Sequence, residues 1–436
     1  MTEKYWGPQE IVRKKKEYII PCLYHFYEEP VQMVKGEGQY LFDSTGKKYL
    51  DFFAGVSVIN AGHCHPQITE RICRQVKTLQ HVCNIYLTQP MLELAEKLAE
   101  ITPGRLQKSF FCNSGSEANE GAVLLAKIAT GRSELLALQD GLSGRTYLDM
   151  SLTGLRFWRT DPNPAGGISF VPNAYCYRCP LNLSYPNCDL ACAEEVRRVI
   201  ETSTSGEPAA LIAEPIQGNA GIVTPPPEYF PRLKEILQEY GALLIVDEVQ
   251  CGFGRTGKWF AIENWGVEPE IMTMAKALGN GVPIGVFTAL PEIADRYTRP
   301  GASTLGGNPV SMTAGLATLE VIEKEGLIRN AATLGSYLRE KLLELKDKHR
   351  LIGDLRGMGL MQGAELVKEG KEPADQEVDR ILEIMKNKGI IIGKNGRFRN
   401  VLAFQPPLVI EQDNVDETAA ALDEALTEVE PFHQVP

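Results

Sequence analysis

The chain has 436 residues, of which 44% are hydrophobic and 23% are charged, and these shares are ordinary for a soluble globular protein. Its net charge of −11 and its lack of a dense cluster of lysine and arginine argue against a nucleic-acid partner. No apolar run reaches the roughly 18 residues of a membrane span and the N-terminus has no apolar signal core, so we predict a cytoplasmic protein without a membrane partner.

Strand and helix patterns change along the chain in a way that indicates more than one structural unit. Two short hairpin strands are expected at residues 39–43 and 48–51. From about residue 90 to 320, apolar runs at 135–138, 209–213 and 243–246 alternate with amphipathic stretches such as 117–130 and 229–240. Uninterrupted apolar runs suit strands that are buried on both faces, so the alternation predicts an α/β fold with a mostly parallel central sheet.

The last part of the chain has a different character. Charged helices are expected at 329–349 and 375–388 and a final helix at 414–428, with a pair of strands near 360–367 and a strand within 401–410. We therefore predict three segments: residues 1–60 join a small domain, residues 61–320 form the large α/β domain, and residues 321–436 form a small α+β domain.

Four of the ten cysteines cluster with the spacing Cys-x2-Cys-x8-Cys-x3-Cys, at Cys176, Cys179, Cys188 and Cys192. The first pair has the spacing of metal ligands, so one interpretation is a structural zinc site with four thiolate ligands. The other is a loop lined by four reduced thiols, and we favour it because short cysteine motifs often match by chance. No residue is therefore assigned to a metal, and the zinc interpretation stays open.

The segment Asn-Ser-Gly-Ser-Glu-Ala-Asn at 113–119 opens a predicted helix. Ser114 and Glu117 have the spacing of a capping box, which leaves backbone N–H groups exposed at the helix start. Such a terminus attracts a phosphate through these N–H groups and the helix dipole. An ordinary capped helix is the simpler interpretation of the motif alone.

Lys276 lies among apolar residues, and Asp247 directly follows the apolar run 243–246. Burial disfavours the ammonium form of lysine, so Lys276 is a candidate for an amine that works neutral or as a Schiff base. Asp247 falls at the carboxyl end of a buried strand, where parallel sheets bind ligands. Pyridoxal phosphate needs both groups, a lysine for its aldehyde and an acid that keeps its ring nitrogen protonated. With this pair, a phosphate at Ser114–Glu117 becomes the favoured interpretation.

A second glycine-rich segment gives a misleading signal. Residues 252–258 match the first seven positions of a P-loop, but Trp259 stands where a serine or threonine must reach magnesium. No helix pattern opens at Lys258 either, so we do not predict a nucleotide hydrolase.

The chain resembles, over nearly its whole length, the class III aminotransferases of fold type I, which depend on pyridoxal phosphate. The matching motifs lie at 50–52, 62–66, 113–119, 214–218, 246–257, 276 and 303–309. So many motifs in matching order make chance an unlikely explanation. The resemblance implies a fold-type I transferase, with a large, mostly parallel-sheet domain that binds the cofactor and a smaller α+β domain.

The resemblance also implies roles for single residues. Lys276 would form the Schiff base and move the proton, while Asp247 pairs with the ring nitrogen. Thr304 would reach the phosphate in the neighbouring subunit, so we expect a homodimer with shared active sites and leave a tetramer open. The remaining cofactor-binding residues implied are Gly115 and Ser116 at the phosphate, Leu142 and Val249 at the ring faces, Gln250 near the phenolic oxygen, and Glu214.

Three positions depart from the family pattern. Leu142 stands where an aromatic residue usually stacks on the ring, a contact worth about 1 kcal/mol. Asn219 and Ala403 replace a glutamate and its partner arginine, which in many members grips the carboxylate of the keto acid. An unpaired buried member of that pair would be costly, so their joint loss is coherent. Arg397 or Arg399 could substitute for the missing arginine.

The sequence does not identify the amino donor or the keto-acid acceptor. Arg145 matches an arginine that holds the far carboxylate of ω-amino acids, or forms an ordinary loop salt bridge. Tyr24 and Phe26 are candidates for the substrate wall, or core residues of the N-terminal segment. We predict an aminotransferase that moves an amino group, by a ping-pong mechanism, from an amine, an ω-amino acid or an alanine-like donor to pyruvate, glyoxylate or 2-oxoglutarate. A lyase or an amino-acid epimerase on the same scaffold is the alternative, and Lys276 argues against a binding protein without turnover.

Overall fold

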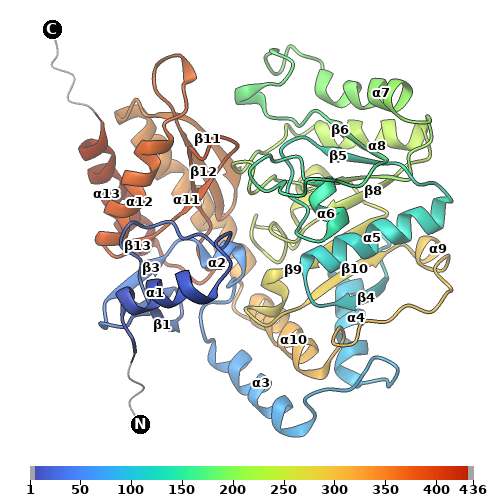
Figure 1. The fold of residues 1–436 in the computed structure, drawn as a ribbon, viewed down its shortest axis with the longest axis horizontal. Helices are drawn as coiled ribbons and strands as arrows, with labels where there is room; N and C mark the ends of the chain where they lie inside the picture. Colours follow the sequence, from blue (N-terminus) through green and yellow to red (C-terminus); the bar gives the residue numbers. More distant parts are fainter. Residues whose placement is uncertain (1–4, 431–436) are drawn as a thin grey trace.

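A seven-stranded sheet forms the core of the larger lobe in the computed structural model, which describes residues 5–430 (Figure 1). Strand β10 runs antiparallel to both its neighbours, β4 and β9, whereas β9, β8, β7, β5 and β6 pair in parallel. The predicted mostly parallel sheet is thus confirmed. In order across the sheet the strands are β4 (Lys108–Cys112), β10 (Gly285–Ala289), β9 (Ile271–Ala275), β8 (Leu243–Asp247), β7 (Ala210–Ala213), β5 (Leu135–Leu138) and β6 (Ile168–Val171).

Strands β5, β7, β9 and β10 are buried along their whole length and β8 is buried except at Leu243, which agrees with the apolar runs predicted at 135–138, 209–213 and 243–246. Helix α5 (Gly115–Thr130) packs across β8, β9 and β10, and α8 (Tyr229–Glu239) packs against β8. The other helices of this lobe are α3 (Pro66–Thr78), α4 (Gln89–Ile101), α6 (Tyr147–Leu152), α7 (Ala191–Ser203), α9 (Pro291–Ala294) and α10 (Pro309–Lys324), with 3-10 turns η1 (Cys176–Arg178), η2 (Ala261–Trp265) and η3 (Lys276–Gly279).

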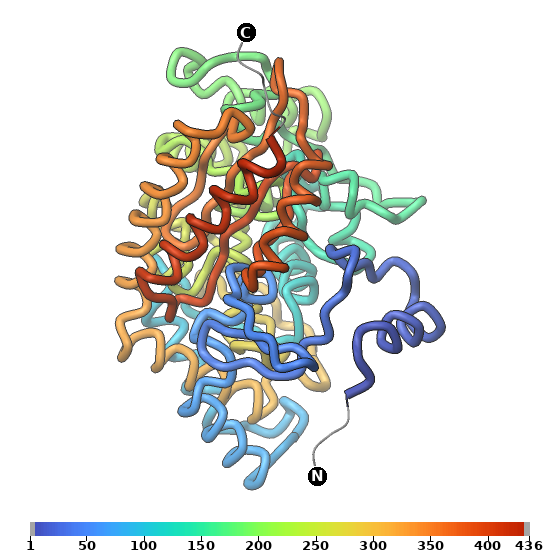
Figure 2. The backbone as a smooth tube through the Cα atoms, turned by 90° about the vertical axis from the view of Figure 1, so that its left-hand side faces the viewer, coloured from blue at the N-terminus to red at the C-terminus, as the bar shows by residue number. Residues whose placement is uncertain are grey.

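The smaller lobe combines the two ends of the chain (Figure 2). The antiparallel sheet β11-β12-β15-β14 lies against the long helix α11, and a second sheet, β1-β2-β3-β13, contains the N-terminal strands. Strand β3 pairs in parallel with β13, which joins the two ends directly. The strands are β1 (Met33–Glu37), β2 (Tyr40–Asp43), β3 (Lys48–Asp51), β11 (Ile352–Met358), β12 (Met361–Leu366), β13 (Ile390–Ile391), β14 (Gly393–Asn395) and β15 (Val401–Phe404). The helices are α1 (Pro8–Tyr18), α2 (Ala54–Ser57), α11 (Leu327–Lys348), α12 (Asp375–Asn387) and α13 (Gln412–Val429), with the 3-10 turn η4 (Glu369–Lys371).

The predicted helices and hairpin strands of this lobe are confirmed within a few residues, but two strand predictions are wrong in extent. The pair expected near 360–367 begins earlier, because β11 comes before the tight turn at Gly359 and Leu360, where Gly359 has a positive φ. The strand expected within 401–410 ends at Phe404, where Pro406 and Pro407 remove backbone donors. No helix within residues 5–430 is long and apolar enough to span a membrane. The division of the chain after residues 60 and 320 stays a prediction.

Candidate active site

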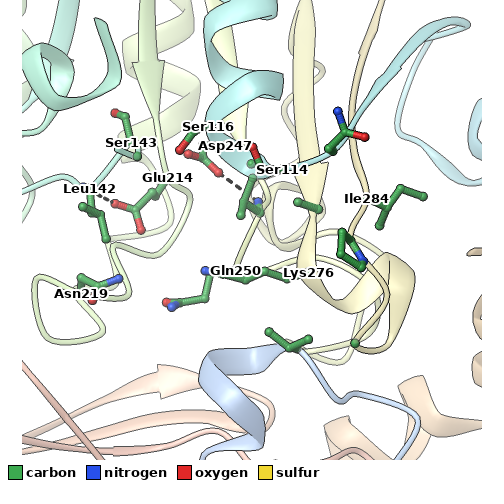
Figure 3. Close-up of a pocket in the computed structure, with 18 of the residues that line it drawn as sticks. Ser114, Ser116, Leu142, Ser143, Glu214, Asn219, Asp247, Gln250, Lys276 and Ile284 are labelled. Atoms are coloured by element: carbon green, nitrogen blue, oxygen red, sulfur yellow. Dashed lines mark hydrogen bonds between the residues drawn. The ribbon is translucent and has the colours of Figure 1, made fainter. Parts of the chain in front are cut away.

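A cavity of about 360 Å³ lies where the carboxyl ends of the parallel strands meet (Figure 3). Asn113 follows β4, Leu142 follows β5 by a few residues, Glu214 follows β7, Asp247 ends β8 and Lys276 follows β9. The short connection before β10 closes the remaining side. This is the position at which open α/β sheets bind ligands.

Lys276 reaches this cavity from a strained backbone position at the start of η3. Its φ of 44° is in the left-handed region, which lysine rarely adopts. Such strain persists only where the surrounding structure enforces it, and it is concentrated at functional sites. Burial lowers the pKa of Lys276, and the nearby carboxyl groups of Asp247 and Glu214 oppose this shift. The amine is therefore easier to deprotonate than that of an exposed lysine.

Asp247 is 5% exposed and has both carboxylate oxygens fixed by donors. The side-chain amide of Asn119 donates to Oδ2 at 2.8 Å, and the backbone N–H of Val249 donates to Oδ1 at 3.0 Å. Burial raises the pKa of Asp247, whereas these two hydrogen bonds and Lys276 oppose the rise. Asp247 is thus held in one orientation beside Lys276.

Glu214 is a second buried carboxyl group at the cavity. Its Oε1 accepts the N–H of Leu142 and its Oε2 accepts the N–H of Gly218, each at 3.0 Å. Burial, and next the charge of Asp247, raise the pKa of Glu214 to about 8. Glu214 therefore ties the loop that carries Leu142 to the wall of the cavity while carrying a proton for most of the time at neutral pH.

The start of α5 forms another wall of the cavity. The side chain of Ser114 accepts the N–H of Glu117 at 3.2 Å, which confirms the predicted N-cap. A Cβ at Gly115 would lie 2.8 Å from Val249 Cγ1, so only glycine lets the helix start approach Val249 this closely. Ser116 Oγ accepts the N–H of Arg145 at 3.0 Å. Free backbone N–H groups at this helix start suit an anion.

Most of the predicted site residues do meet at this cavity. Its lining includes Gly115, Ser116, Leu142, Glu214, Asn219, Asp247, Val249, Gln250 and Lys276. Thr304 and Arg145 do not line it: Thr304 is exposed on the segment before α10, and Arg145 is exposed next to Gly144 of the cavity wall.

The predicted substrate-wall residues lie in an aromatic cluster instead of in the lining. The Tyr24 ring centroid is 5.8 Å from those of Phe26 and Phe157. The guanidinium of Arg399 lies 4.9 Å from the Phe157 ring and donates to Tyr24 Oη at 3.3 Å. Ala403 is fully buried in β15. The substrate role of Tyr24 and Phe26 stays a prediction.

The four clustered cysteines line one small, separate cavity beside η1. All ten cysteines of the chain are free thiols. In the part of the chain that the structure describes, no three His, Cys, Asp or Glu side chains are placed so that they could hold a metal ion. This geometry offers no ligand set for the zinc interpretation, and the loop of reduced thiols stays a prediction.

Two polar residues of the site had no assigned role at the sequence level. Asn119 belongs to the recognised helix motif, but its bond to Asp247 spans 128 positions and leaves no local signal. Asp149 is fully buried in α6, and neither of its carboxyl oxygens has a hydrogen-bond partner. The only hint in the sequence is a charged residue within the otherwise uncharged segment 146–155.

This combination of a mostly parallel sheet, a half-buried lysine beside a buried carboxylate at its carboxyl edge, and a capped helix start defines a fold-type I enzyme of pyridoxal phosphate. A family profile described as aminotransferase class-III matches residues 25–426. The chain belongs to the class III aminotransferase family, whose members depend on pyridoxal phosphate, and it is an enzyme with aminotransferase activity.

Named relatives and solved structures agree with this. The chain is 42% identical over 441 residues, 98% of this chain and 89% of the other, to alanine–glyoxylate aminotransferase 2 homolog 2, mitochondrial, of Arabidopsis thaliana. It is also 42% identical over 429 residues, 97% and 96% of the two chains, to the leucine/methionine racemase of Thermococcus litoralis. An aminotransferase from Bacillus anthracis superimposes with a TM-score of 0.90 at 35% identity, covering 96% of this chain and 98% of that one.

The residues present fit the cofactor. The cavity volume suits a small molecule. Gln250 is 5% exposed, yet both polar atoms of its amide are without a partner, as expected for a group that waits for a ligand. One wall offers helix N–H groups for a phosphate and another offers a lysine amine beside a fixed carboxylate.

Proposed function

We propose that Lys276 is the amine that holds pyridoxal phosphate and that Asp247 keeps the ring nitrogen protonated. The observation that carries this proposal is their common position at the ends of adjacent parallel strands, facing one cavity. When bound, the cofactor supplies an aldehyde for the amino group and a ring that takes up electrons from the breaking bond. Lys276, with its pKa lowered by burial, then accepts and returns the proton at the substrate carbon.

The other residues of the cavity bind and orient. We propose that Gly115 and Ser116 bind the phosphate at the start of α5, where N–H groups are free. Leu142 and Val249 would cover the two ring faces and Gln250 would contact the phenolic oxygen, with Glu214 holding the Leu142 loop in place. Support for Gln250 comes from its unpartnered amide.

We further propose that Arg397 binds the carboxylate of the keto acid. Its loop contacts the cavity, because the N–H of Gly396 donates to the backbone oxygen of Asn219 at 3.0 Å. Arg397 Nη1 lies 3.8 Å from Asp140 Oδ2, and the arginine side chain is 60% exposed. So loose a pair can exchange Asp140 for a substrate carboxylate at little cost. Arg399 is a weaker candidate, because it is engaged in the aromatic cluster.

Small substrates suit this cavity and the arginines near it. We propose an amine, an ω-amino acid or alanine as the donor and a small keto acid, glyoxylate, pyruvate or 2-oxoglutarate, as the acceptor. The name of the Arabidopsis relative, which joins alanine and glyoxylate, favours that pair. Arg145 is proposed for the far carboxylate of longer donors, since it is exposed at the rim and forms no salt bridge among residues 5–430.

Half-reactions test the proposed donors and acceptors as well as the role of Arg397. The purified enzyme is mixed with alanine, β-alanine, 4-aminobutyrate or 1-phenylethylamine, and the cofactor spectrum should shift and then return with glyoxylate or pyruvate. Arg397→Ala should raise the KM of the keto acid about tenfold or more, the cost of a lost charge-assisted pair, without changing that of 1-phenylethylamine. Arg350→Ala, at an exposed arginine after α11, is the matched control. An unchanged keto-acid KM in Arg397→Ala would eliminate Arg397 from this role.

A racemase is the second candidate, because the Thermococcus litoralis relative is as similar in identity as the Arabidopsis one. Loss of the usual Glu/Arg pair, seen here as Asn219 and Ala403, also weakens the argument for a keto-acid partner. The enzyme is incubated with L-leucine or L-methionine alone in deuterated water. Formation of the D-isomer without a keto acid would favour racemisation, and release of ammonia would favour a lyase.

We propose that the enzyme works in the cytoplasm as a homodimer, in which Thr304 of one subunit reaches the cofactor phosphate of the other. Ten free thiols suit a reducing compartment. Segments 1–60 and 321–436 are proposed to form one small domain around the β3–β13 pair, with 61–320 as the large domain. Sedimentation of wild type and Thr304→Ala, with cofactor affinity of both, tests the shared site; a monomer with full affinity would contradict it.

A further inference from the structure

Asp149 is a carboxyl group placed where an anion is costly. It lies in α6 and is fully buried; neither oxygen makes a hydrogen bond of good geometry, and the hydroxyl groups of Ser116 and Thr146 are the polar groups beside it. Among residues 5–430 no salt bridge includes it. The charged groups that face it, Glu120 of α5 and Asp247 at the end of β8, are both acidic. Burial of an ionised carboxylate without a partner costs several kcal/mol, so the neutral acid is strongly preferred.

The carboxyl group lies directly behind the proposed phosphate site. A Cβ at Gly144 would overlap both Ser116 Oγ and Asp149 Oδ2, so these two oxygens approach the same side of Gly144. Ser116 lines the cavity, whereas Asp149 lies behind it. The hydroxyl groups of Ser116 and Thr146 are the polar groups that stabilise the ionised form of Asp149.

Ser116 Oγ has two lone pairs and one hydrogen to distribute. One lone pair accepts the N–H of Arg145 at 3.0 Å. If the second lone pair accepts a hydrogen from Asp149, the hydroxyl hydrogen of Ser116 is left to point into the cavity. If Asp149 is ionised, it takes that hydrogen instead, and Ser116 can offer a phosphate nothing but a lone pair.

We propose that Asp149 is a positioning residue that stays protonated in the working enzyme, donates its hydrogen to Ser116 Oγ, and thereby turns the Ser116 hydroxyl toward the phosphate of the cofactor. This inference rests on the proposed function of Ser116. Burial, together with the charges of Glu120 and Asp247, raises the pKa of Asp149 to about 9, which keeps the proton in place at neutral pH. Loss of that proton removes a donor from the phosphate and adds a negative charge behind it.

Cofactor affinity as a function of pH tests this directly. The dissociation constants of pyridoxal phosphate and of pyridoxal, which lacks the phosphate, are measured by fluorescence at about pH 7.5 and about pH 10. In wild type, the constant for pyridoxal phosphate should rise about tenfold or more relative to that for pyridoxal, the size of a one-unit coupling between two charges. The quantity compared is the ratio of the dissociation constant of pyridoxal phosphate to that of pyridoxal. Titration of the lysine or of the ring affects both ligands and cancels in this ratio, so a change in the ratio reports on the phosphate.

Variants of Asp149 distinguish the effect of its donated hydrogen on phosphate binding from the effect of its negative charge. Asp149→Asn keeps a donor and cannot ionise, so its ratio should match wild type at pH 7.5 and stay within about twofold at pH 10. Asp149→Ala should bind pyridoxal phosphate about fivefold or more weakly at pH 7.5, and its ratio should also be independent of pH. Asp413→Asn, at an exposed aspartate of α13, should behave as wild type.

The outcomes are distinct. A wild-type ratio that does not change with pH, or one that changes equally in Asp149→Asn, overturns the role of Asp149. If Asp149→Asn fails to fold, the wild-type comparison of the two ligands still decides. If wild type binds neither ligand at pH 7.5, the proposed function itself fails, and this inference fails with it.

Discussion

Arg255 connects three segments that are far apart in sequence, and its replacement should loosen the contact between the lobes. It is fully buried in the loop after β8. Its Nη1 donates to the backbone oxygen of Leu360 at 3.0 Å and also to that of Pro406, and its Nη2 donates to the side-chain oxygen of Asn60. Asn60 in turn donates to the oxygen of Phe253 at 2.8 Å.

The size of the effect follows from the three acceptors. Arg255→Met keeps the length of the side chain but leaves three buried oxygens without these donors, at about 1–2 kcal/mol each, or about 3–6 kcal/mol in all. Part of this loss is offset, because the substitution also removes the desolvation cost of a buried guanidinium. That cost is visible in the pKa of Arg255, which burial lowers to about 9. The unpaired acceptors remain, so we expect a net loss of about 3 kcal/mol in the free energy of unfolding.

Urea unfolding followed by circular dichroism measures this loss as a shift in the midpoint of the first transition. Arg350→Met, at an exposed arginine, is the control for the loss of one positive charge. The double variant Asn60→Ala/Arg255→Met should be destabilised by less than the sum of the single variants, because both remove the same bond. If Arg255→Met unfolds at the same midpoint as Arg350→Met, the three hydrogen bonds do not hold the lobes together.

Three further changes have defined outcomes. Lys276→Ala should lower kcat of the half-reaction by about 10³-fold or more and remove the absorbance band of the lysine-bound cofactor, while the fold, read by circular dichroism, is retained. Asn119→Ala removes a donor to the buried Asp247 carboxylate, so kcat should fall about tenfold, and a pH–rate profile should show a raised pKa for the acid; an unshifted profile would count against this. Asp149 keeps a proton in the native state up to a pKa of about 9, whereas the unfolded chain releases it near pH 4, so the stability of wild type should fall between these values. Asp149→Asn should lack this decline and should unfold at higher urea than wild type at pH 8.

The residues with the strongest chemistry were the easiest to predict. Lys276 and Asp247 interrupt apolar sequence, and a charge in such a setting is visible without any knowledge of the fold. The capped helix start was equally local, because Ser114 and Glu117 are three positions apart. Parallel strands then bring their carboxyl ends to one edge, which is enough to assemble the cavity from separate motifs.

The contacts that tune these residues were beyond prediction from one sequence. Asn119 reaches Asp247 only because α5 packs across β8 and β9. The glycine-rich segment that resembles a P-loop turned out to position Arg255 against the smaller lobe, a role that no local spacing encodes. Tyr24 and Phe26, expected at the substrate wall, pack around the half-buried Arg399, because one cation can stack on several rings at once.

Three buried carboxyl groups at or behind the cavity, those of Asp247, Glu214 and Asp149, differ in how strongly their surroundings stabilise the ionised form. Asp247 has two donors and the amine of Lys276, and Glu214 has two backbone N–H groups, with a pKa raised to about 8. Asp149, which makes no hydrogen bond of good geometry among residues 5–430, has a pKa raised to about 9. At neutral pH Glu214 and Asp149 therefore carry their protons for most of the time, and Asp247 is the carboxyl group near Lys276 whose ionised form receives the most support. Three buried anions beside a phosphate would repel one another, so protonation of Glu214 and Asp149 favours the ionised form of Asp247.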